Sequence, residues 1–235
     1  MARSNGSPRR ATLIASALVV GVIIVAGAVL TGRALLGDET DTSPTARPTS
    51  ADSSSKCDLP DGDLEKLTEP PADVEWELIN TYALPSGAAG PAEETAGVHH
   101  CYGRSSEGAV LAAASFAIDL STPGMDYRQL VDLRVAGPGA AQLEALADFP
   151  EADLVELTAP NVSQIVAFRV DSISEDQALI QIVHRYSTGP AAGTFAAFPV
   201  DLRWDDGDWK YYAAEGLTAP VPVANLTSFV EWSGA

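Results

Sequence analysis

The feature that most constrains this chain is an uncharged stretch of 22 residues, 11–32, rich in Val, Ile, Leu and Ala. As a helix at about 1.5 Å per residue it would reach about 33 Å, enough to cross a hydrocarbon core of about 30 Å. Three arginines precede it, Arg33 follows it, and the charged residues after Arg33 begin with acids. This bias predicts that residues 1–10 are cytoplasmic and that the bulk of the chain lies outside the cell membrane.

A cleaved signal peptide is the alternative. Its apolar stretch would be about 7–15 residues long and would be followed by a cleavage site of small residues. Ala26-Gly27-Ala28 has suitable residues but lies inside the apolar stretch, and the pair Arg9-Arg10 lacks the hydrophobic residues expected directly after a twin-arginine signal. We therefore expect a single-pass anchor, and in either case an exported domain.

The chain beyond the anchor divides into a linker and a domain. Residues 33–56 contain mostly Ser, Thr, Pro and Asp after residue 37, which predicts a flexible linker. Residues 57–235 have the length of one domain. After residue 37 the chain carries 32 acidic and 10 basic residues. Such a surface repels phosphate backbones, so we expect no direct nucleic-acid binding.

The sequence contains two cysteines, Cys57 and Cys101. In an exported domain a lone pair of cysteines is most simply a disulfide. Closing a loop of this length would stabilise the domain by about 4 kcal/mol in the chain-entropy account. Two free buried thiols are the alternative.

Apolar periodicity and turn signals indicate an α+β domain. Strands are expected at 74–84 and 98–102, and helices at 108–120, 126–136 and 140–147. Two long hairpins are expected after Pro160, from strands at 164–170, 177–186, 194–204 and 209–213.

A two-residue turn at Asp206-Gly207 would fix the register of the second hairpin. Trp204 would then face Trp209, and Leu202 would face Tyr211, all on one side of the sheet. The opposite side would carry the polar set Asp201, Arg203, Asp205, Asp208, Lys210 and Tyr212. We therefore expect a sheet with one buried face.

Few residues suggest chemistry. His99-His100-Cys101 is the only local cluster of metal-ligand types, and zinc usually needs three or four ligands, so we expect no metal site and no cofactor. His184 shares strand parity with Ile180 and Ile182, so it would point inward, beside an acid such as Asp119. A satisfied core histidine is the simpler interpretation, and we expect no catalytic residues.

Two α-helices followed by long antiparallel hairpins resemble the nuclear transport factor 2-like cone fold, in which a hairpin like residues 204–210 recurs. After the anchor and the linker, the chain contains Cys57-Asp-Leu-Pro, Trp76, Cys101, Gly108-Ala-Val-Leu-Ala-Ala-Ala and Phe229-Val-Glu-Trp232. This whole layout resembles an actinobacterial family of uncharacterised membrane proteins associated with integrative and conjugative elements.

The architecture is also similar to the bitopic inner-membrane component of type IV secretion machines, which has no catalytic residues. The resemblance implies a non-enzymatic assembly component whose partners are other envelope proteins, with self-association as a further expectation. One alternative is an envelope module holding a small apolar ligand inside the cone, which a cone filled by Phe168, Trp204 and Trp209 would exclude. The other is an enzyme that uses His184.

Overall fold

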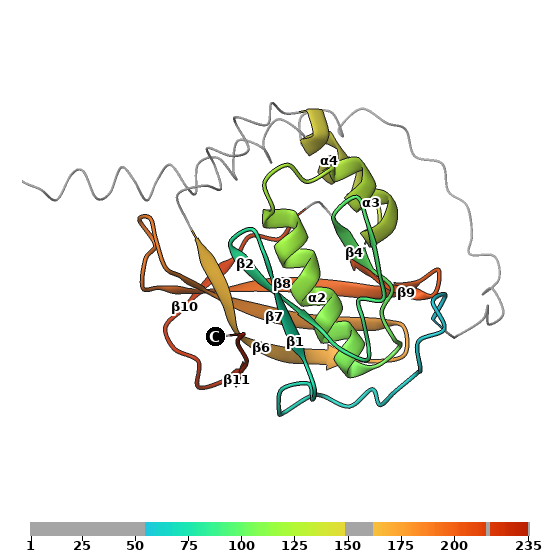
Figure 1. Cartoon of the computed structure of the whole chain (residues 1–235), viewed down its shortest axis with the longest axis horizontal. Coiled ribbons are helices and arrows are strands. Elements are labelled where there is room, and N and C mark those ends of the chain that lie inside the picture. Colours follow the sequence, from blue (N-terminus) through green and yellow to red (C-terminus); the bar gives the residue numbers. More distant parts are fainter. Residues whose placement is uncertain (1–54, 149–161, 215–216, 235) are drawn as a thin grey trace, which may run out of the picture. The chain divides into compact units, whose positions relative to one another are not determined.

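The computed structural model describes residues 55–148, 162–214 and 217–234, which all belong to one structural unit, Ser50–Ala235. Helices and a large sheet pack together in it, which confirms the α+β class (Figure 1). The elements are β1 (Glu75–Ile79), β2 (Tyr82–Ser86), β3 (Glu93–Thr95), β4 (Val98–His100), α2 (Ser106–Ser121), α3 (Tyr127–Arg134), β5 (Val135–Ala136), α4 (Ala140–Glu144), η1 (Ala145–Asp148), β6 (Ser163–Ile173), β7 (Gln177–Tyr186), β8 (Phe195–Asp205), β9 (Asp208–Tyr212), β10 (Val221–Val223) and β11 (Val230–Glu231).

Helix α2 lies across one face of the large sheet (Figure 1). It begins where the Ser105 hydroxyl accepts a hydrogen bond from the N–H of Gly108 at 3.0 Å, and Pro123 follows its end. Most of its side chains are small and buried, so the backbone can approach its neighbours closely. Gly108 is required there, because a Cβ at this position would lie 2.1 Å from the carbonyl oxygen of Gly103.

The large sheet has seven strands in the described part of the chain, in the order β11-β6-β7-β8-β9-β5, with β10 added to β8. The pairs are antiparallel except β5 with β9, which is parallel. Strand β6 is irregular against β7 between Ile165 and Ala167 and again between Val170 and Ser172. Each extra residue bends the strand, and the first one keeps Ile165 and Phe168, three positions apart, in one core cluster.

A second, smaller cluster lies on the opposite face of the sheet. Ala167, Val183 and Ala197 form a row across β6, β7 and β8 there. Leu226 and Phe229, from the C-terminal segment, pack on this row. The sheet is therefore covered on both faces, by α2 on one side and by the C-terminal segment on the other.

The expected strand at 98–102 ends at His100, and the expected helix at 140–147 is divided into α4 and η1. Two further expected elements also differ from the structure. Residues 74–84 do not form one strand, because the chain reverses after Ile79 and β1 and β2 form a hairpin. Asn80 adopts a φ of 56° at this turn, a conformation that asparagine tolerates better than most residues. The helix expected at 126–136 ends at Arg134, since Val135 and Ala136 instead pair with β9.

The expected register of the β8–β9 hairpin is confirmed, with Trp204 facing Trp209 and Leu202 facing Tyr211. The expected polar face is wrong at two positions, because Asp208 is fully buried and Lys210 is 9% exposed. The N–H of Lys56 bonds to the carbonyl oxygen of Gly207 at 3.0 Å, and the N–H of Cys101 bonds to Asp208. Other segments of the chain therefore cover this end of the hairpin.

The predicted anchor, residues 11–32, lies outside the described residues, as does the predicted linker up to residue 54. Within the described residues no helix is both long enough and apolar enough to span a membrane. The last two residues assigned to the linker, Ser55 and Lys56, already contact the domain.

Candidate functional site

A buried polar cluster lies where β4, α2 and α3 meet. We define it by five side chains that are at most 6% exposed: His99, Tyr102, Ser115, Asp119 and Arg134. β4 and the segment after it supply the first two, α2 supplies Ser115 and Asp119, and the last turn of α3 supplies Arg134. Burying ionisable groups this close together destabilises the folded state unless each group has hydrogen-bond or ion-pair partners. The partners of each group therefore indicate what the cluster does.

Arg134 is the centre of the polar cluster. Its guanidinium donates to the carbonyl oxygen of His99 and, at 2.8 Å, to that of Ala112. Its Nη1 lies 3.7 Å from Oδ2 of Asp119, and its Cζ lies 4.8 Å from the ring centroid of Tyr102. Carbonyl dipoles, one carboxylate and an aromatic face thus compensate the buried cation.

Asp119 pairs with His99. Its Oδ1 lies 2.7 Å from Nδ1 of His99, and its Oδ2 accepts the backbone N–H of the same residue at 3.2 Å. The other ring nitrogen of His99 lies 3.9 Å from a carboxylate oxygen of Glu94, which is exposed. A histidine and an acid in this geometry can pass a proton, but the carboxylate is also engaged by Arg134 and by the backbone.

His184 is a buried core histidine, as the simpler interpretation of its sequence expected, and the polar contact found for its ring is with Ser163 and not with Asp119. Its burial agrees with its parity with Ile180 and Ile182, and its Nδ1 contacts Oγ of Ser163 at 3.2 Å. Burial of the imidazole, which disfavours its charged form, lowers the pKa of His184 to about 4. At neutral pH it is therefore an uncharged core side chain bonded to a hydroxyl.

The consecutive residues His99, His100 and Cys101 do not face one point. His99 turns to Asp119, whereas Nε2 of His100 lies 3.0 Å from Oγ1 of Thr95 and its Nδ1 lies 3.4 Å from Sγ of Cys101. Desolvation lowers the pKa of His100, although the carboxylates of Asp208 and Glu93 oppose this shift.

Cys57 and Cys101 form a disulfide with a Cα–Cα separation of 5.9 Å, which confirms the expected pairing. Cys101 has a φ of 70°, and its N–H donates to Oδ2 of Asp208 at 2.8 Å. Oδ1 of Asp208 accepts the N–H of Tyr102 at 2.8 Å and that of Trp209 at 2.9 Å. Sequence reasoning missed Asp208, which lies in a run of acids at a turn and carries no sign of its burial.

The hydroxyl of Tyr102 contacts Oγ of Ser115, which also donates to the carbonyl oxygen of Leu111 at 3.1 Å. Burial raises the pKa of the Tyr102 phenol, so it keeps its proton at neutral pH. Together with the contacts of Arg134, Asp119 and Asp208, these bonds use the polar groups of the cluster to join β4, α2, α3 and β9. The arrangement is suited to fixing the fold.

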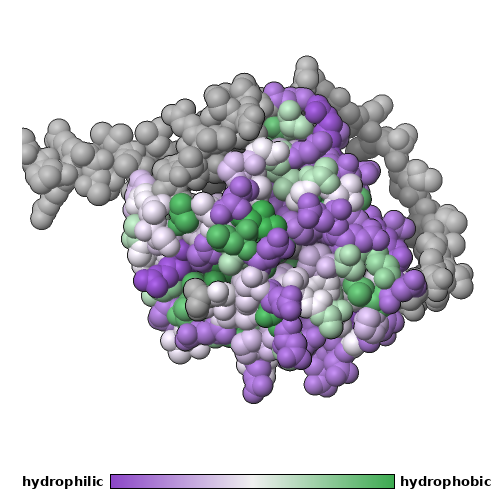
Figure 2. Space-filling view, viewed as in Figure 1, coloured by the Kyte–Doolittle hydropathy of each residue, from purple (hydrophilic) through white to green (hydrophobic). Residues whose placement is uncertain are grey.

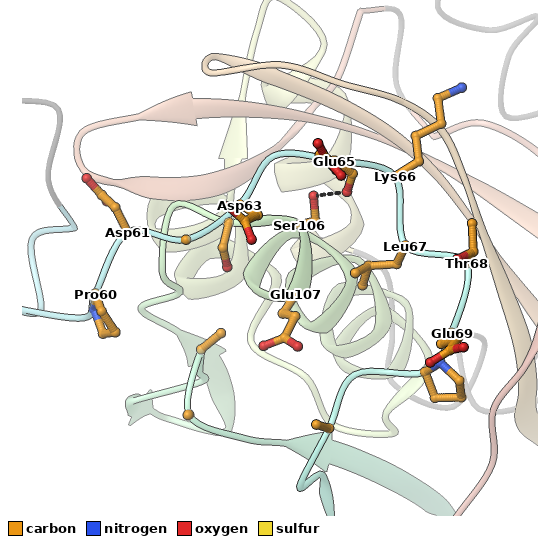
Figure 3. Close-up of a pocket in the computed structure, with 16 residues that line it drawn as sticks. Pro60, Asp61, Asp63, Glu65, Lys66, Leu67, Thr68, Glu69, Ser106 and Glu107 are labelled. Atoms are coloured by element: carbon orange, nitrogen blue, oxygen red, sulfur yellow. Dashed lines mark hydrogen bonds between the residues drawn. The ribbon is translucent and has the colours of Figure 1, made fainter.

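A groove of about 550 Å³ lies between the extended segment 60–72 and the start of α2 (Figure 3). The hydroxyl of Ser106 donates to the carbonyl oxygen of Glu65 at its edge. The acidic residues that line it are Asp61, Asp63, Glu65, Glu69 and Glu107. Lys66 is the one basic residue among the lining residues, so the groove is predominantly acidic and repels anions.

The surface shown in Figure 2 is mostly hydrophilic, with apolar areas between the hydrophilic ones. Leu78 of β1 is 70% exposed and Val221 of β10 is 53% exposed. Single exposed apolar residues of this kind are ordinary on folded domains.

A family model for a domain of unknown function, DUF8175, matches residues 38–233 of this chain. No curated protein and no solved structure matches it. The match spans the described domain and the segment that leads into it. The chain therefore belongs to the family of the domain of unknown function DUF8175.

Proposed function

We propose that this chain is a non-enzymatic, membrane-anchored component of a conjugation or secretion apparatus, which acts outside the cytoplasm through protein–protein contacts. The observation that carries the proposal is that the buried ionisable groups bond to other parts of the domain. Asp119, Asp208 and Arg134 each bond to backbone or side-chain groups of the fold itself. Groups committed in this way stabilise a scaffold and are poorly placed to act on a substrate.

The sequence supports the membrane and assembly parts of the proposal. The uncharged residues 11–32 would fix the chain in the cell membrane, and the polar residues 33–56 would let the domain reach other envelope proteins or a second copy of itself. Helices packed on a bent antiparallel sheet are also what a nuclear transport factor 2-like cone fold requires. That fold is the one that the resemblance to secretion components implies.

The two alternative functions have less support. A ligand-binding cone needs space on the face of the sheet that α2 covers, but Phe168 and Trp209 are fully buried in the core there, and Trp204 packs against it. An enzyme using His184 needs a carboxylate beside the imidazole, whereas the polar contact found at His184 is the hydroxyl of Ser163.

The proposal is tested by deleting the gene in a host that carries a conjugative element and measuring transfer frequency. We expect transfer to fall at least about 100-fold and the full chain to restore it. A version whose residues 1–32 are replaced by a cleaved secretory signal is expected to be exported without restoring transfer. If the His184→Gln variant also restores transfer, the role in transfer does not depend on catalysis by His184. Unchanged transfer after deletion would refute the assembly role.

A further inference from the structure

Strand β1 has one side that carries no other strand. In the described part of the chain it pairs only with β2, in a two-stranded sheet separate from the large one (Figure 1). Ile79 faces Tyr82 across a two-residue turn, and residues that flank such a turn form a hydrogen-bonded pair. Because bonded and non-bonded pairs alternate, Glu77 also bonds to β2, whereas the backbone groups of Leu78 and Trp76 point away from it.

The contacts of β2 agree with this alternation. Ala83 lies opposite Leu78, and its N–H donates to Oε1 of Gln164 at 3.1 Å instead of to β1. Pro85 lies opposite Trp76 and has no N–H to donate. The N–H and C=O groups of Leu78 and Trp76 therefore form an open edge that can accept another strand.

β1 lacks the features that protect other outer strands. β5 and β11, at the ends of the large sheet, are two residues long, and β10 carries a proline, Pro222. β1 has five residues in continuous register, without a proline, a lysine or a bulge. Leu78 is 70% exposed on this strand. The exposure of one leucine is ordinary, but this leucine lies on an open strand edge.

The edge is held in place before any partner binds. The ring of Trp76 packs on that of Trp232, with centroids 4.9 Å apart, and Ile79 packs against the core. The side-chain amide of Gln164, on β6, donates to the carbonyl oxygen of Thr81 at the hairpin turn. A partner strand would therefore meet a preformed edge, so that binding orders only the partner.

The side chains of β1 favour a basic partner. Glu75 and Glu77 are exposed and lie on one face of the strand. Side chains directly opposite each other on neighbouring strands have Cβ atoms about 4.5–5.5 Å apart, so opposite charges there are favourable and like charges are not. A second copy of the chain fits poorly, because antiparallel pairing over all five residues sets Glu77 opposite Glu77 of that copy.

We propose that β1 binds an extended segment of a partner protein by strand addition, and that this segment carries Lys or Arg opposite Glu75 and Glu77 and an aliphatic residue opposite Leu78. Main-chain hydrogen bonds at Trp76 and Leu78 supply the affinity, and the side chains supply the preference for sequence. This inference rests on the proposed function, since it names a surface for the protein–protein contacts.

The test uses the full chain, purified in a mild detergent, and a blocked peptide of sequence Thr-Lys-Val-Lys-Val-Lys-Thr. The control peptide has the same sequence and charge but carries N-methyl groups on both valines, whose N–H groups would bond to β1. We expect the first peptide to slow hydrogen exchange at the amides of Trp76 and Leu78 at least about tenfold, because amides on an open edge exchange readily. The control peptide should not slow it. Mass spectrometry of overlapping fragments measures the exchange.

Matched variants separate strand addition from attraction between charges, with affinity measured by the fluorescence anisotropy of a labelled peptide. Leu78→Pro removes an outward N–H that β2 does not use, so it should weaken binding at least about tenfold and leave the hairpin paired. Glu75→Gln combined with Glu77→Gln should weaken binding about threefold or more. Glu144→Gln, which removes an exposed charge on α4, should leave binding unchanged. If Leu78→Pro fails to fold, the comparison of the two peptides on the wild type still decides.

Three results would overturn the proposal. The first is equal binding of the two peptides, which would reduce the interaction to charge. The second is unchanged exchange at Trp76 and Leu78 at a high peptide concentration. The third is a dimer of the chain that Leu78→Pro dissociates, which would assign the edge to a second copy. Failure of the proposed function is distinguishable from these, because it shows as unchanged transfer after gene deletion and not as a loss of peptide binding.

Discussion

The carboxylate of Asp208 holds the backbone of Cys101 across 107 positions of sequence, with Oδ2 accepting its N–H at 2.8 Å. The other oxygen accepts the N–H groups of Tyr102 and Trp209. Cys101 has a φ of 70°, so a fixed partner for its N–H helps to hold an unfavourable backbone conformation. One side chain of β9 thus positions the residue that carries the disulfide.

Replacing Asp208 with Asn should lower the free energy of unfolding by about 2 kcal/mol, because charge-assisted bonds are lost and the amide nitrogen would face a backbone N–H donor. Urea unfolding followed by tryptophan fluorescence measures the change. Asp205→Asn is the matched control, since this carboxylate is more than half exposed. Equal stability of the two variants would show that the buried carboxylate contributes little.

Local signals predicted the elements that depend on neighbouring residues. The alanine-rich residues 108–120, followed by a turn signal, predicted α2. The turn at Asp206-Gly207 predicted the register of β8 and β9. Both residues of that turn have positive φ, 51° and 70°, as a two-residue hairpin turn of type I′ requires. The strand predicted at 74–84 failed because no glycine or proline marks its turn.

The polar contacts could not be predicted in this way. The alternation of side chains along the strand predicted that His184 points inward. It did not predict the partner of His184, because an acidic residue on α2 can lie beside any of several strands. The actual partner of Asp119, His99, comes from a short hairpin whose position depends on the disulfide and on Asp208. These contacts join residues far apart in sequence, and the local pattern of a single sequence carries no signal for them.

The ion pair of Arg134 and Asp119 is expected to behave as a buried unit. Arg134→Met should destabilise the domain by about 3 kcal/mol or more, since it leaves a buried carboxylate short of a partner. Asp119→Leu should cost a similar amount, and the double variant should cost less than the sum of the two. Chemical denaturation of the wild type, the two single variants and the double variant gives the coupling energy.

Arg128→Met is the control, because it removes an exposed ion pair with Asp148. It should change the free energy of unfolding by less than about 1 kcal/mol. Additive effects at Arg134 and Asp119 would contradict this account.

The disulfide is expected to contribute about 4 kcal/mol, because it closes a loop between residues 44 positions apart. Cys57→Ser with Cys101→Ser should therefore unfold at a much lower urea concentration than the oxidised wild type. A double variant within about 1 kcal/mol of the oxidised protein would mean that the 55–57 segment is held by its hydrogen bonds alone.

His184 should make the domain sensitive to mild acid. Its pKa is lowered to about 4 in the fold, against an ordinary value of 6.5, so the unfolded chain binds a proton between these pH values and the folded chain does not. The contribution of uncharged His184 to the free energy of unfolding is fully present above pH 6.5 and is lost as the pH falls toward 4. His184→Gln can still bond to Ser163 but cannot be protonated. Between pH 7.5 and pH 5 its free energy of unfolding should therefore fall by about 2 kcal/mol less than that of the wild type. Urea titrations at a series of pH values measure both curves. Parallel curves would show that His184 titrates normally in the folded domain, and hence that its imidazole is reached by water.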